Sequence, residues 1–342
     1  MIPGTRKLSI VCPVYNEEEV ILDFHAELVR VVNELAARFE TEIIYVVDRC
    51  TDRTLELLSG AAAADPRVKV LGLSARFGHQ MSLLAGIDHA RGDAVVMLDS
   101  DLEHPPGLIP AMIERWEQGF DIVFTTREAS PKGFLKRHTS KLFYRVLNGM
   151  SNVPMTENSP DFRLISAKVA RVFREQIRER NQFLRGLFSW VGFNRTSLGY
   201  ADQMRTKGKT KYTVSRLLRF AISGIVSFSK RPLQWAVITG FAFALFGLFL
   251  ALVTFIQFFT GQKLPQGWAT LVVLISVVSG VQLIFLGIIG EYIGAIFDEV
   301  KARPHYIVDQ AINFEEPMKL APPTFAQPSI GSGFPPPSFP PR

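Results

Sequence analysis

The sequence predicts an α/β domain with a mostly parallel sheet, followed by a hairpin of two apolar helices. Two observations lead to this prediction. Over residues 8–125, short runs of apolar and β-branched residues alternate with stretches of helical periodicity, a pattern typical of βαβ units. Residues 233–297, in contrast, contain almost no charged side chains. A chain of 342 residues is long enough for one such domain and the apolar hairpin.

Five short apolar runs have the length and composition of strands. The predicted strands are 8–14, 42–47, 68–72, 94–98 and 121–125. Between them apolar residues recur at helical spacing, as Val20, Phe24, Leu28 and Val31 do in the first stretch. The predicted helices are 18–39, 53–63, 79–90, 108–119 and an amphipathic segment at 134–149. Right-handed crossovers bring the loops after the strands to one edge of the sheet, where open α/β sheets bind ligands.

Two later segments are too long and too apolar to be ordinary core helices. Residues 233–259 and 268–297 each exceed the roughly 20 residues that cross a bilayer core. The link between them, TGQKLPQG, contains one Pro and two Gly, which favours a tight turn outside the hydrocarbon. The sequence therefore predicts two membrane-spanning helices in a hairpin.

The distribution of Lys and Arg predicts the orientation of this hairpin. Basic residues gather in 205–232, whereas the link offers only Lys263. By the positive-inside rule, the N-terminal domain and the C-terminal tail face the cytosol. Residues 214–228 combine these charges with an apolar side, which predicts an amphipathic helix lying in the membrane interface.

Composition sets further bounds. The formal net charge of +6 suits an anionic partner, and the basic cluster beside the apolar region favours lipid head groups over nucleic acid. Two cysteines give no disulfide framework. The N-terminus lacks the pattern of a signal peptide, so we expect a multi-pass protein of the cytoplasmic (inner) membrane. The predicted division is a catalytic domain (1–204), a basic juxtamembrane segment (205–232), two transmembrane helices (233–297), a cytosolic extension (298–316) and a disordered Pro-rich tail (317–342).

The strongest chemical signal is Asp99-Ser100-Asp101, directly after the apolar strand 94–98. Two carboxylates separated by one residue can converge on a hard divalent cation such as Mg²⁺ or Mn²⁺, which also binds diphosphate oxygens. Such a metal would neutralise the charge that develops on a leaving diphosphate. The motif thus favours a metal-dependent reaction of a nucleotide diphosphate.

Further motifs occur in a specific order. They are PVYNEEE (13–19), the turn from Asp48 to Asp52, DSDLEHPP (99–106), DFRL (161–164), RNQFLRGLFSWVGF (180–193) and KGKTKY (207–212). Together they resemble the family 2 glycosyltransferases that make polyprenyl-phosphate sugars, such as dolichyl-phosphate mannose synthases and bacterial bactoprenol glucosyltransferases. The ending GEYIGAIFDEVKARPHYIV (290–308) resembles the bacterial two-span members, which also suggest a homo-oligomer.

The resemblance implies a GT-A fold and an inverting transfer from a UDP-glucose-class or GDP-mannose-class donor to a polyprenyl phosphate. The residues it implies for donor binding are Pro13, Tyr15, Glu17, Asp48, Arg76, Asp99 and Ser100. Asp99 and Asp101 would hold Mg²⁺ or Mn²⁺, and Asp101 with Asp161 would be catalytic. Because the acceptor is a phosphate that is already ionised near pH 7, its main need is cationic positioning. The candidate cations are Arg163, assigned a catalytic role, and Arg127, Lys136, Arg185, Lys209 and Lys211 for the lipid phosphate.

The chain departs from its relatives in the turn after the second strand, where Val47, Arg49 and Cys50 replace Asp, Gly and Ser. This departure leaves open a non-catalytic nucleotide-sugar-binding scaffold. A polysaccharide synthase of the same superfamily is a further alternative, although Met112 stands in place of Gln in the Gln-x-x-Arg-Trp motif of that class.

Overall fold

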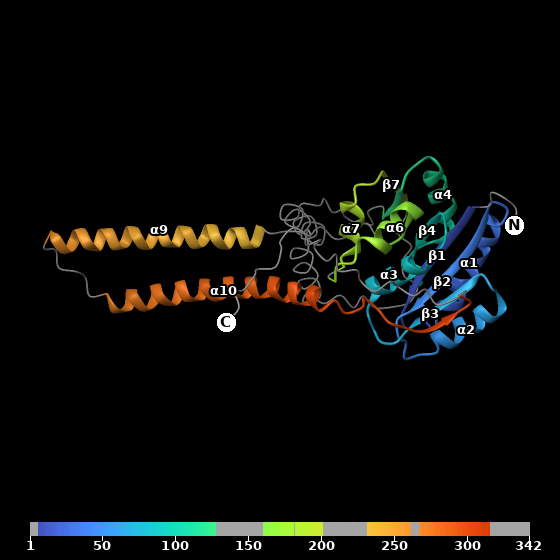
Figure 1. Ribbon diagram of the computed structural model, residues 1–342, viewed down its shortest axis with the longest axis horizontal. Coiled ribbons are helices and arrows are strands. Elements are labelled where there is room, and N and C mark those ends of the chain that lie inside the picture. The colour runs from blue at the N-terminus through green and yellow to red at the C-terminus, as the bar shows by residue number, and fades with distance from the viewer. Residues whose placement is uncertain (1–5, 128–159, 181, 201–230, 261–266, 315–342) are drawn as a thin grey trace, which may run out of the picture.

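The computed structural model describes residues 6–127, 160–180, 182–200, 231–260 and 267–314. These residues form a layered α/β domain and two long helices that run side by side away from it (Figure 1). The predicted helix at 134–149, the predicted interfacial helix at 214–228 and the tail from 317 lie outside the described residues.

An eight-stranded sheet forms the centre of the domain. Its strands are β1 (Arg6–Val14), β2 (Phe39–Val47), β3 (Val68–Leu73), β4 (Ala94–Met97), β5 (Ile122–Arg127), β6 (Arg163–Ser166), β7 (Arg195–Tyr200) and β8 (Val308–Ile312). Their spatial order is β7-β5-β6-β4-β1-β2-β3-β8. Neighbours are parallel in the pairs β1–β2, β1–β4, β2–β3 and β5–β7, and antiparallel where β6 or β8 pairs. The predicted fold class, a mostly parallel α/β sheet with two apolar helices, is confirmed.

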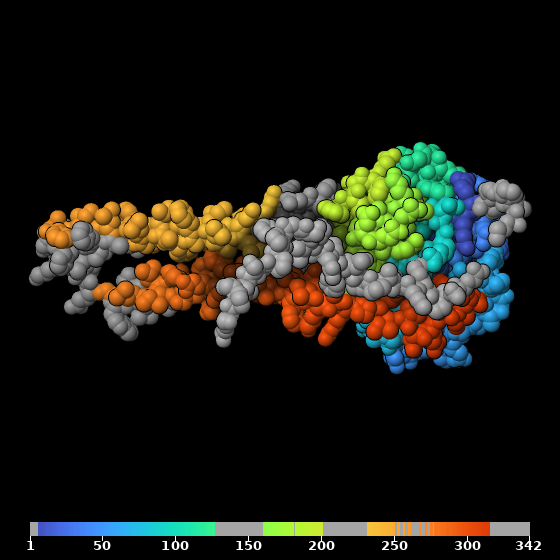
Figure 2. Space-filling view, viewed as in Figure 1, coloured from blue at the N-terminus to red at the C-terminus, as the bar shows by residue number. Residues whose placement is uncertain are grey.

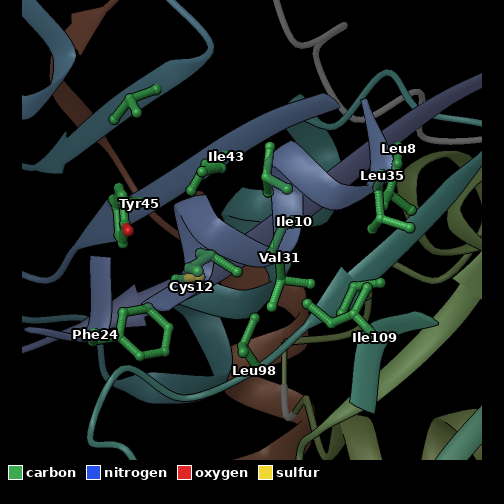
Figure 3. Packing of buried hydrophobic residues seen from close by; sticks show 14 of the residues in the cluster. Leu8, Ile10, Cys12, Phe24, Val31, Leu35, Ile43, Tyr45, Leu98 and Ile109 are labelled. Carbon is green, nitrogen blue, oxygen red and sulfur yellow. The ribbon is translucent and has the colours of Figure 1, made fainter. Parts of the chain in front are cut away.

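Helices cover one face of the sheet over a large core. They are α1 (Ile21–Leu35), α2 (Thr54–Ala64) and α4 (Ile109–Glu117), the last preceded by a short 3-10 turn. Side chains of Phe24, Leu58 and Met112 meet alternate residues of β1 and β2 here. Figure 3 shows Cys12 and Tyr45 from these strands in the cluster. Each fully buried aliphatic or aromatic side chain contributes about 1.5–3 kcal/mol to folding.

The opposite face is covered by three other helices. They are α3 (His79–His89), α6 (Ala167–Glu175) and α7 (Leu184–Trp190). α3 lies close to β1, because a Cβ atom added at Gly86 would come within 2.1 Å of Val11 Cγ1. Only glycine therefore allows this approach. The close packing fixes the first turn of α3 near the carboxyl ends of β1 and β4.

All five predicted strands and the predicted helices at 18–39, 53–63, 79–90 and 108–119 are present, with ends that shift by a few residues. Five further elements were not predicted from the sequence: β6, α6, α7, β7 and β8. β7 and β8 lie at the two edges of the sheet, where one side of a strand has no neighbour and hydrophobic patterning is weak.

The two apolar helices are α9 (Arg231–Phe259) and α10 (Trp268–Lys301), close to the predicted bounds. The stretches 231–249 and 277–301 are long and apolar enough to cross a membrane, and neither is buried against protein. Large apolar side chains such as Phe241, Leu248 and Ile284 are more than half exposed. Such a surface needs an apolar environment.

The segment after α10 contributes a strand to the sheet. Residues 298–316 were predicted to form a cytosolic extension, and β8 within them pairs antiparallel with β3 at the edge of the sheet. We refer to residues 303–314 as the C-terminal strap. Its Ile307 carbonyl accepts a hydrogen bond from Ser74 N at 2.9 Å, and Asn313 Nδ2 donates to the carbonyls of Ala62 and Val68. Figure 2 shows the strap, in red, lying along the domain.

Acid should weaken the docking of the strap through His305. Its side chain is buried, and burial, together with the charges of Arg178 and Arg180, lowers the pKa of His305 to about 4. In the unfolded chain, His305 takes up a proton near pH 6.5. The stability that the neutral, buried His305 contributes is therefore fully present above that pH, and it is lost as the pH falls from there through about 4. The expected loss is about 3 kcal/mol at most. Thermal unfolding in detergent between pH 7 and pH 4.5 checks it. The variant His305→Gln should show a shallower pH dependence than the wild type, and an equal slope would contradict this role.

Candidate active site

A cavity of about 260 Å³ lies where β1, β2 and β4 end. The sheet order reverses between β1 and β4, which is where open α/β sheets bind ligands. Eight residues predicted for the donor and metal line the cavity: Pro13, Tyr15, Glu17, Asp48, Arg76, Asp99, Ser100 and Asp101. The structure thus brings the separate motifs of the first hundred residues into one place.

The loops after β1 and β2 hold each other in position. Asn16, at a φ of 53°, donates through its backbone to Cys50 Sγ at 3.2 Å and exchanges two hydrogen bonds with Thr51. Asp52 accepts from both the backbone and the hydroxyl of Thr54, and Thr54 Oγ1 accepts from Glu17 N at 3.0 Å. Burial raises the pKa of the Cys50 thiol, so it remains protonated near neutral pH. Cys50 is therefore a structural partner of the first loop.

Asp48 fixes the loop that leads into α3. Its two carboxylate oxygens accept from Phe77 N at 2.7 Å and Gly78 N at 2.9 Å. Gly78 has a φ of 93°, a conformation that side chains disfavour. In the same loop the Arg76 guanidinium lies 4.0 Å from the centre of the Tyr15 ring. The Asp48 carboxylate thus shapes the cavity wall as well as lining it.

The motif 99–101 begins just after β4. Ser100 Oγ donates to the Pro13 carbonyl at 3.1 Å, which joins the motif to the end of β1. Asp101 Oδ1 accepts from Glu103 N at 3.1 Å. The buried His104 accepts from Asp99 N at 3.0 Å through Nδ1, so it is a hydrogen-bonding residue of the loop. Both aspartates remain at the cavity.

A second group of charges lies beside the cavity around Asp161. This buried carboxylate accepts two hydrogen bonds from Arg185, at 2.9 and 2.8 Å, and one from Arg163 at 3.3 Å. Burial opposes its ionisation, but Arg185 and Arg163 hold the pKa of Asp161 below its ordinary value. Burial lowers the pKa of Arg163 to about 10, so the guanidinium is still charged near pH 7. Its carbon also lies 4.6 Å from the centre of the Phe188 ring.

His79 connects the two groups. Its Nε2 lies 2.7 Å from Asp99 Oδ1, and its Nδ1 lies 3.8 Å from Asp161 Oδ2. The His79 side chain is 42% exposed, so desolvation disfavours the charged imidazole only in part. The charge and hydrogen bond of Asp99 and the charge of Asp161 outweigh this desolvation and raise the pKa of His79 to about 9. Burial alone would raise the pKa of Asp99, but the charge of His79 holds this pKa well below its ordinary value. The site is therefore a continuous row of alternating charges from Asp99 to Arg185.

The remaining predicted residues are only partly placed. Arg127 is the last residue of β5, and its side chain is not among those described. Lys136, Lys209 and Lys211 lie outside the described residues. His79 was not predicted as a site residue, although it follows a strand in the same kind of loop as Asp48 and Asp99, and that position indicates a place at the same sheet edge.

The carboxylates of Asp99 and Asp101 suit a divalent cation that takes only one or two of its ligands from the protein. In the described part of the chain no three His, Cys, Asp or Glu side chains form a closed metal site. Mg²⁺ commonly uses one or two carboxylates and completes its shell with water and substrate phosphates. Two aspartates at the edge of an open cavity supply that number of hard oxygen ligands.

Comparisons with known proteins agree with this geometry. The profile described as glycosyl transferase family 2 matches residues 9–173. An uncharacterized glycosyltransferase of Bacillus subtilis, YkcC, is 40% identical over 309 residues, covering 90% of this chain and 94% of the relative. A prophage-derived bactoprenol glucosyl transferase of Shigella flexneri is 39% identical over 314 residues, covering 89% and 98%.

Among solved structures, a glucosyl-3-phosphoglycerate synthase from Mycobacterium tuberculosis in complex with Mn²⁺ and UDP is 16% identical and has a TM-score of 0.44. The match covers 65% of this chain and 76% of that one. The two bacterial glycosyltransferases named above are similar to this chain over nearly their whole length. The chain is a glycosyltransferase and belongs to glycosyl transferase family 2.

Proposed function

We propose that the protein transfers a sugar from a nucleotide diphosphate donor to a polyprenyl phosphate, with inversion at the anomeric carbon. The observation that carries the proposal is the adjacency of two groups joined by His79: the carboxylates at 99 and 101, and the Arg163–Asp161–Arg185 cluster. One group suits a metal-bound diphosphate and the other an anionic acceptor. Relatives named bactoprenol glucosyl transferase support this acceptor class.

The donor would occupy the cavity at the strand ends. Tyr15, Asp48 and Arg76, which follow β1, β2 and β3, line the cavity, and we expect them to contact the base and ribose. Asp99 and Asp101 would hold Mg²⁺ or Mn²⁺, which supplies Lewis-acid stabilisation of the leaving diphosphate when bound. Arg49 and Cys50, the departures from the family pattern, make hydrogen bonds that hold the loops around the cavity. That structural role weakens the case for a scaffold without activity.

The acceptor phosphate would lie on the Arg185 side of the site. Its oxygen attacks the anomeric carbon as the bond from that carbon to the diphosphate oxygen breaks, so one C–O bond forms and one is lost. Since the phosphate is already ionised near pH 7, its alignment matters more than removal of a proton. Arg185, held by Asp161, and the buried Arg163 are the described cations that suit this task. Arg127, Lys136, Lys209 and Lys211 are proposed to extend it.

We further propose that α9 and α10 cross the cytoplasmic membrane, with the catalytic domain and both chain ends in the cytosol. Their length, apolar character and exposure support the crossing. The basic segment at 205–232 supports the orientation. Tethering the site to the bilayer surface would raise the effective concentration of a lipid acceptor.

Transfer of radiolabelled sugar into organic-extractable lipid tests the proposal. Membranes containing the full chain receive polyprenyl phosphate, Mg²⁺ or Mn²⁺, and UDP-glucose or GDP-mannose in separate reactions. We expect labelled lipid with one donor only. The matched control replaces polyprenyl phosphate by the corresponding polyprenol, which lacks the phosphate and should accept no label. Equal labelling of the two lipids would contradict a phosphate acceptor, and nucleotide binding without labelling by any donor would favour the scaffold.

A further inference from the structure

The C-terminal strap binds Asp88, and Asp88 in turn binds Arg178 in the segment that leads to Arg185. We propose that Tyr306, in the strap, is a positioning residue for sugar transfer. It acts through Asp88 and Arg178, and it keeps Arg185 in register with Asp161. The inference rests on the proposed function for its catalytic consequence, but the contacts on which it is built are independent of that function.

A buried three-residue joint anchors the strap. Asp88, near the C-terminal end of α3, is fully buried. Tyr306 OH donates to Asp88 Oδ2 at 2.8 Å, and Arg178 NH1 donates to both oxygens of Asp88 at 2.8 and 2.9 Å. Tyr306 is itself buried and packs in the same core cluster as α3 and α6. A buried carboxylate with a charged partner and a neutral donor is sensitive to the loss of either one.

Arg178 begins the segment that runs from the end of α6 into the first turn of α7. We call residues 178–185, all described except 181, the connector. Three contacts along the connector fix it to other elements. Arg178 binds Asp88, Arg180 N donates to Glu299 Oε2 of α10 at 2.7 Å, and Leu184 N donates to Gln80 Oε1 at 3.1 Å. The next residue is Arg185, with its two hydrogen bonds to Asp161.

The joint therefore links both ends of α3 to the same connector. The first turn of α3 carries Gln80 next to His79, and its last turn carries Asp88. Only a short stretch of chain separates the end of α10 at Lys301 from Tyr306. A shift of α10 would therefore reach Arg178 through Tyr306 and the buried Asp88. If Tyr306 no longer holds Asp88, Arg178 can shift, and the placement of Arg185 relaxes with it.

Tyr306→Phe tests the proposal, because it removes only the hydroxyl and keeps the packed ring. Asn313→Ala is the matched control: it removes strap hydrogen bonds to Ala62 and Val68, at the β8 end and away from Arg178. Both are measured in the full chain in detergent with lipid. We expect Tyr306→Phe to lower kcat about tenfold with the KM for the nucleotide sugar unchanged, because no residue of the connector is among those that line the donor cavity. Asn313→Ala should retain the wild-type kcat.

Two further measurements separate positioning from general loosening. Hydrogen exchange of the peptide spanning 182–187 should be faster in Tyr306→Phe and unchanged in Asn313→Ala. In an Arg185→Lys background, adding Tyr306→Phe should cost less than twofold, because the group being positioned is already lost. An unchanged kcat and exchange in Tyr306→Phe would overturn the proposal, and so would equal losses in Asn313→Ala. If no donor supports transfer even by the wild type, the proposed function fails separately. The hydrogen-exchange comparison then still tests whether Tyr306 positions the connector. Faster exchange in Tyr306→Phe alone supports this role, and equal exchange in the two variants overturns it.

Discussion

Replacing Asp101 by asparagine is expected to reduce sugar transfer about a thousandfold while leaving the fold intact. Asp101 lines the cavity and accepts a backbone hydrogen bond from Glu103, which an asparagine oxygen can also accept. The amide keeps the shape of the side chain but loses the negative charge, and with it the ability to hold Mg²⁺ or Mn²⁺ against a diphosphate. Loss of Lewis-acid stabilisation of a leaving diphosphate costs several kcal/mol in the transition state, and about 4 kcal/mol corresponds to that factor.

The measurement is the initial rate of lipid labelling across a range of Mg²⁺ and Mn²⁺ concentrations. Asp93→Asn is the control. Asp93 lies just before the first residue of β4, at the end of the strand away from the cavity, and accepts a hydrogen bond from Lys7 N. It should transfer at the wild-type rate. Chelation with EDTA should stop the wild type and be reversed by added metal. Transfer by Asp101→Asn at more than a tenth of the wild-type rate would remove Asp101 from the proposed metal site.

The sequence predicted the centre of the fold well, for a physical reason. β1 and β2 are buried on both faces, so almost every side chain from Leu8 to Val14 is apolar or buried, and such runs stand out without any knowledge of tertiary structure. β8 reads Val-Asp-Gln-Ala-Ile with three exposed residues, and β7 alternates exposed and half-buried positions. Their identity as strands depends on an available sheet edge, which the local sequence does not encode.

The same distinction applies to the site. Asp48 and Asp99 could be predicted to lie together because each follows a strand, and the edge of a parallel sheet collects such residues. The pairing of Asp161 with Arg185 could not. Arg185 was predicted as a contact for the lipid phosphate, but it reaches Asp161 only because α7 packs on the sheet beside α3. Which of the many carboxylates pairs with Arg185 depends on the tertiary packing, so it could be learned only from the fold.

The second large effect is expected from Asp161→Asn, which should lower kcat by about a hundredfold. Asparagine is the informative change. Truncation to alanine would leave the buried Arg163 with neither the charge nor any hydrogen-bond acceptor at this position, and breaking a buried pair in this way costs about 3–5 kcal/mol in stability. The amide fills the same space and can still accept one hydrogen bond, but it cannot accept the two-pronged contact of Arg185 with full strength. His79 would also lose one of the two charges that hold it.

Because Asp161 is negative and its neighbours are positive, whether kcat and each KM rise or fall in the variant is informative. Removing the charge leaves Arg163 and Arg185 more available to an anion, so the KM for polyprenyl phosphate should stay the same or fall while kcat falls. The KM for the nucleotide sugar should stay unchanged. Asp121→Asn is the control, since Asp121 binds Ser166 and Lys168 beside the start of β5. A rise in the KM for the lipid phosphate with an unchanged kcat would mean that Asp161 organises acceptor binding alone. A fall in kcat with the acceptor still bound would instead assign to this buried carboxylate the alignment of the cations and His79 around the reacting atoms.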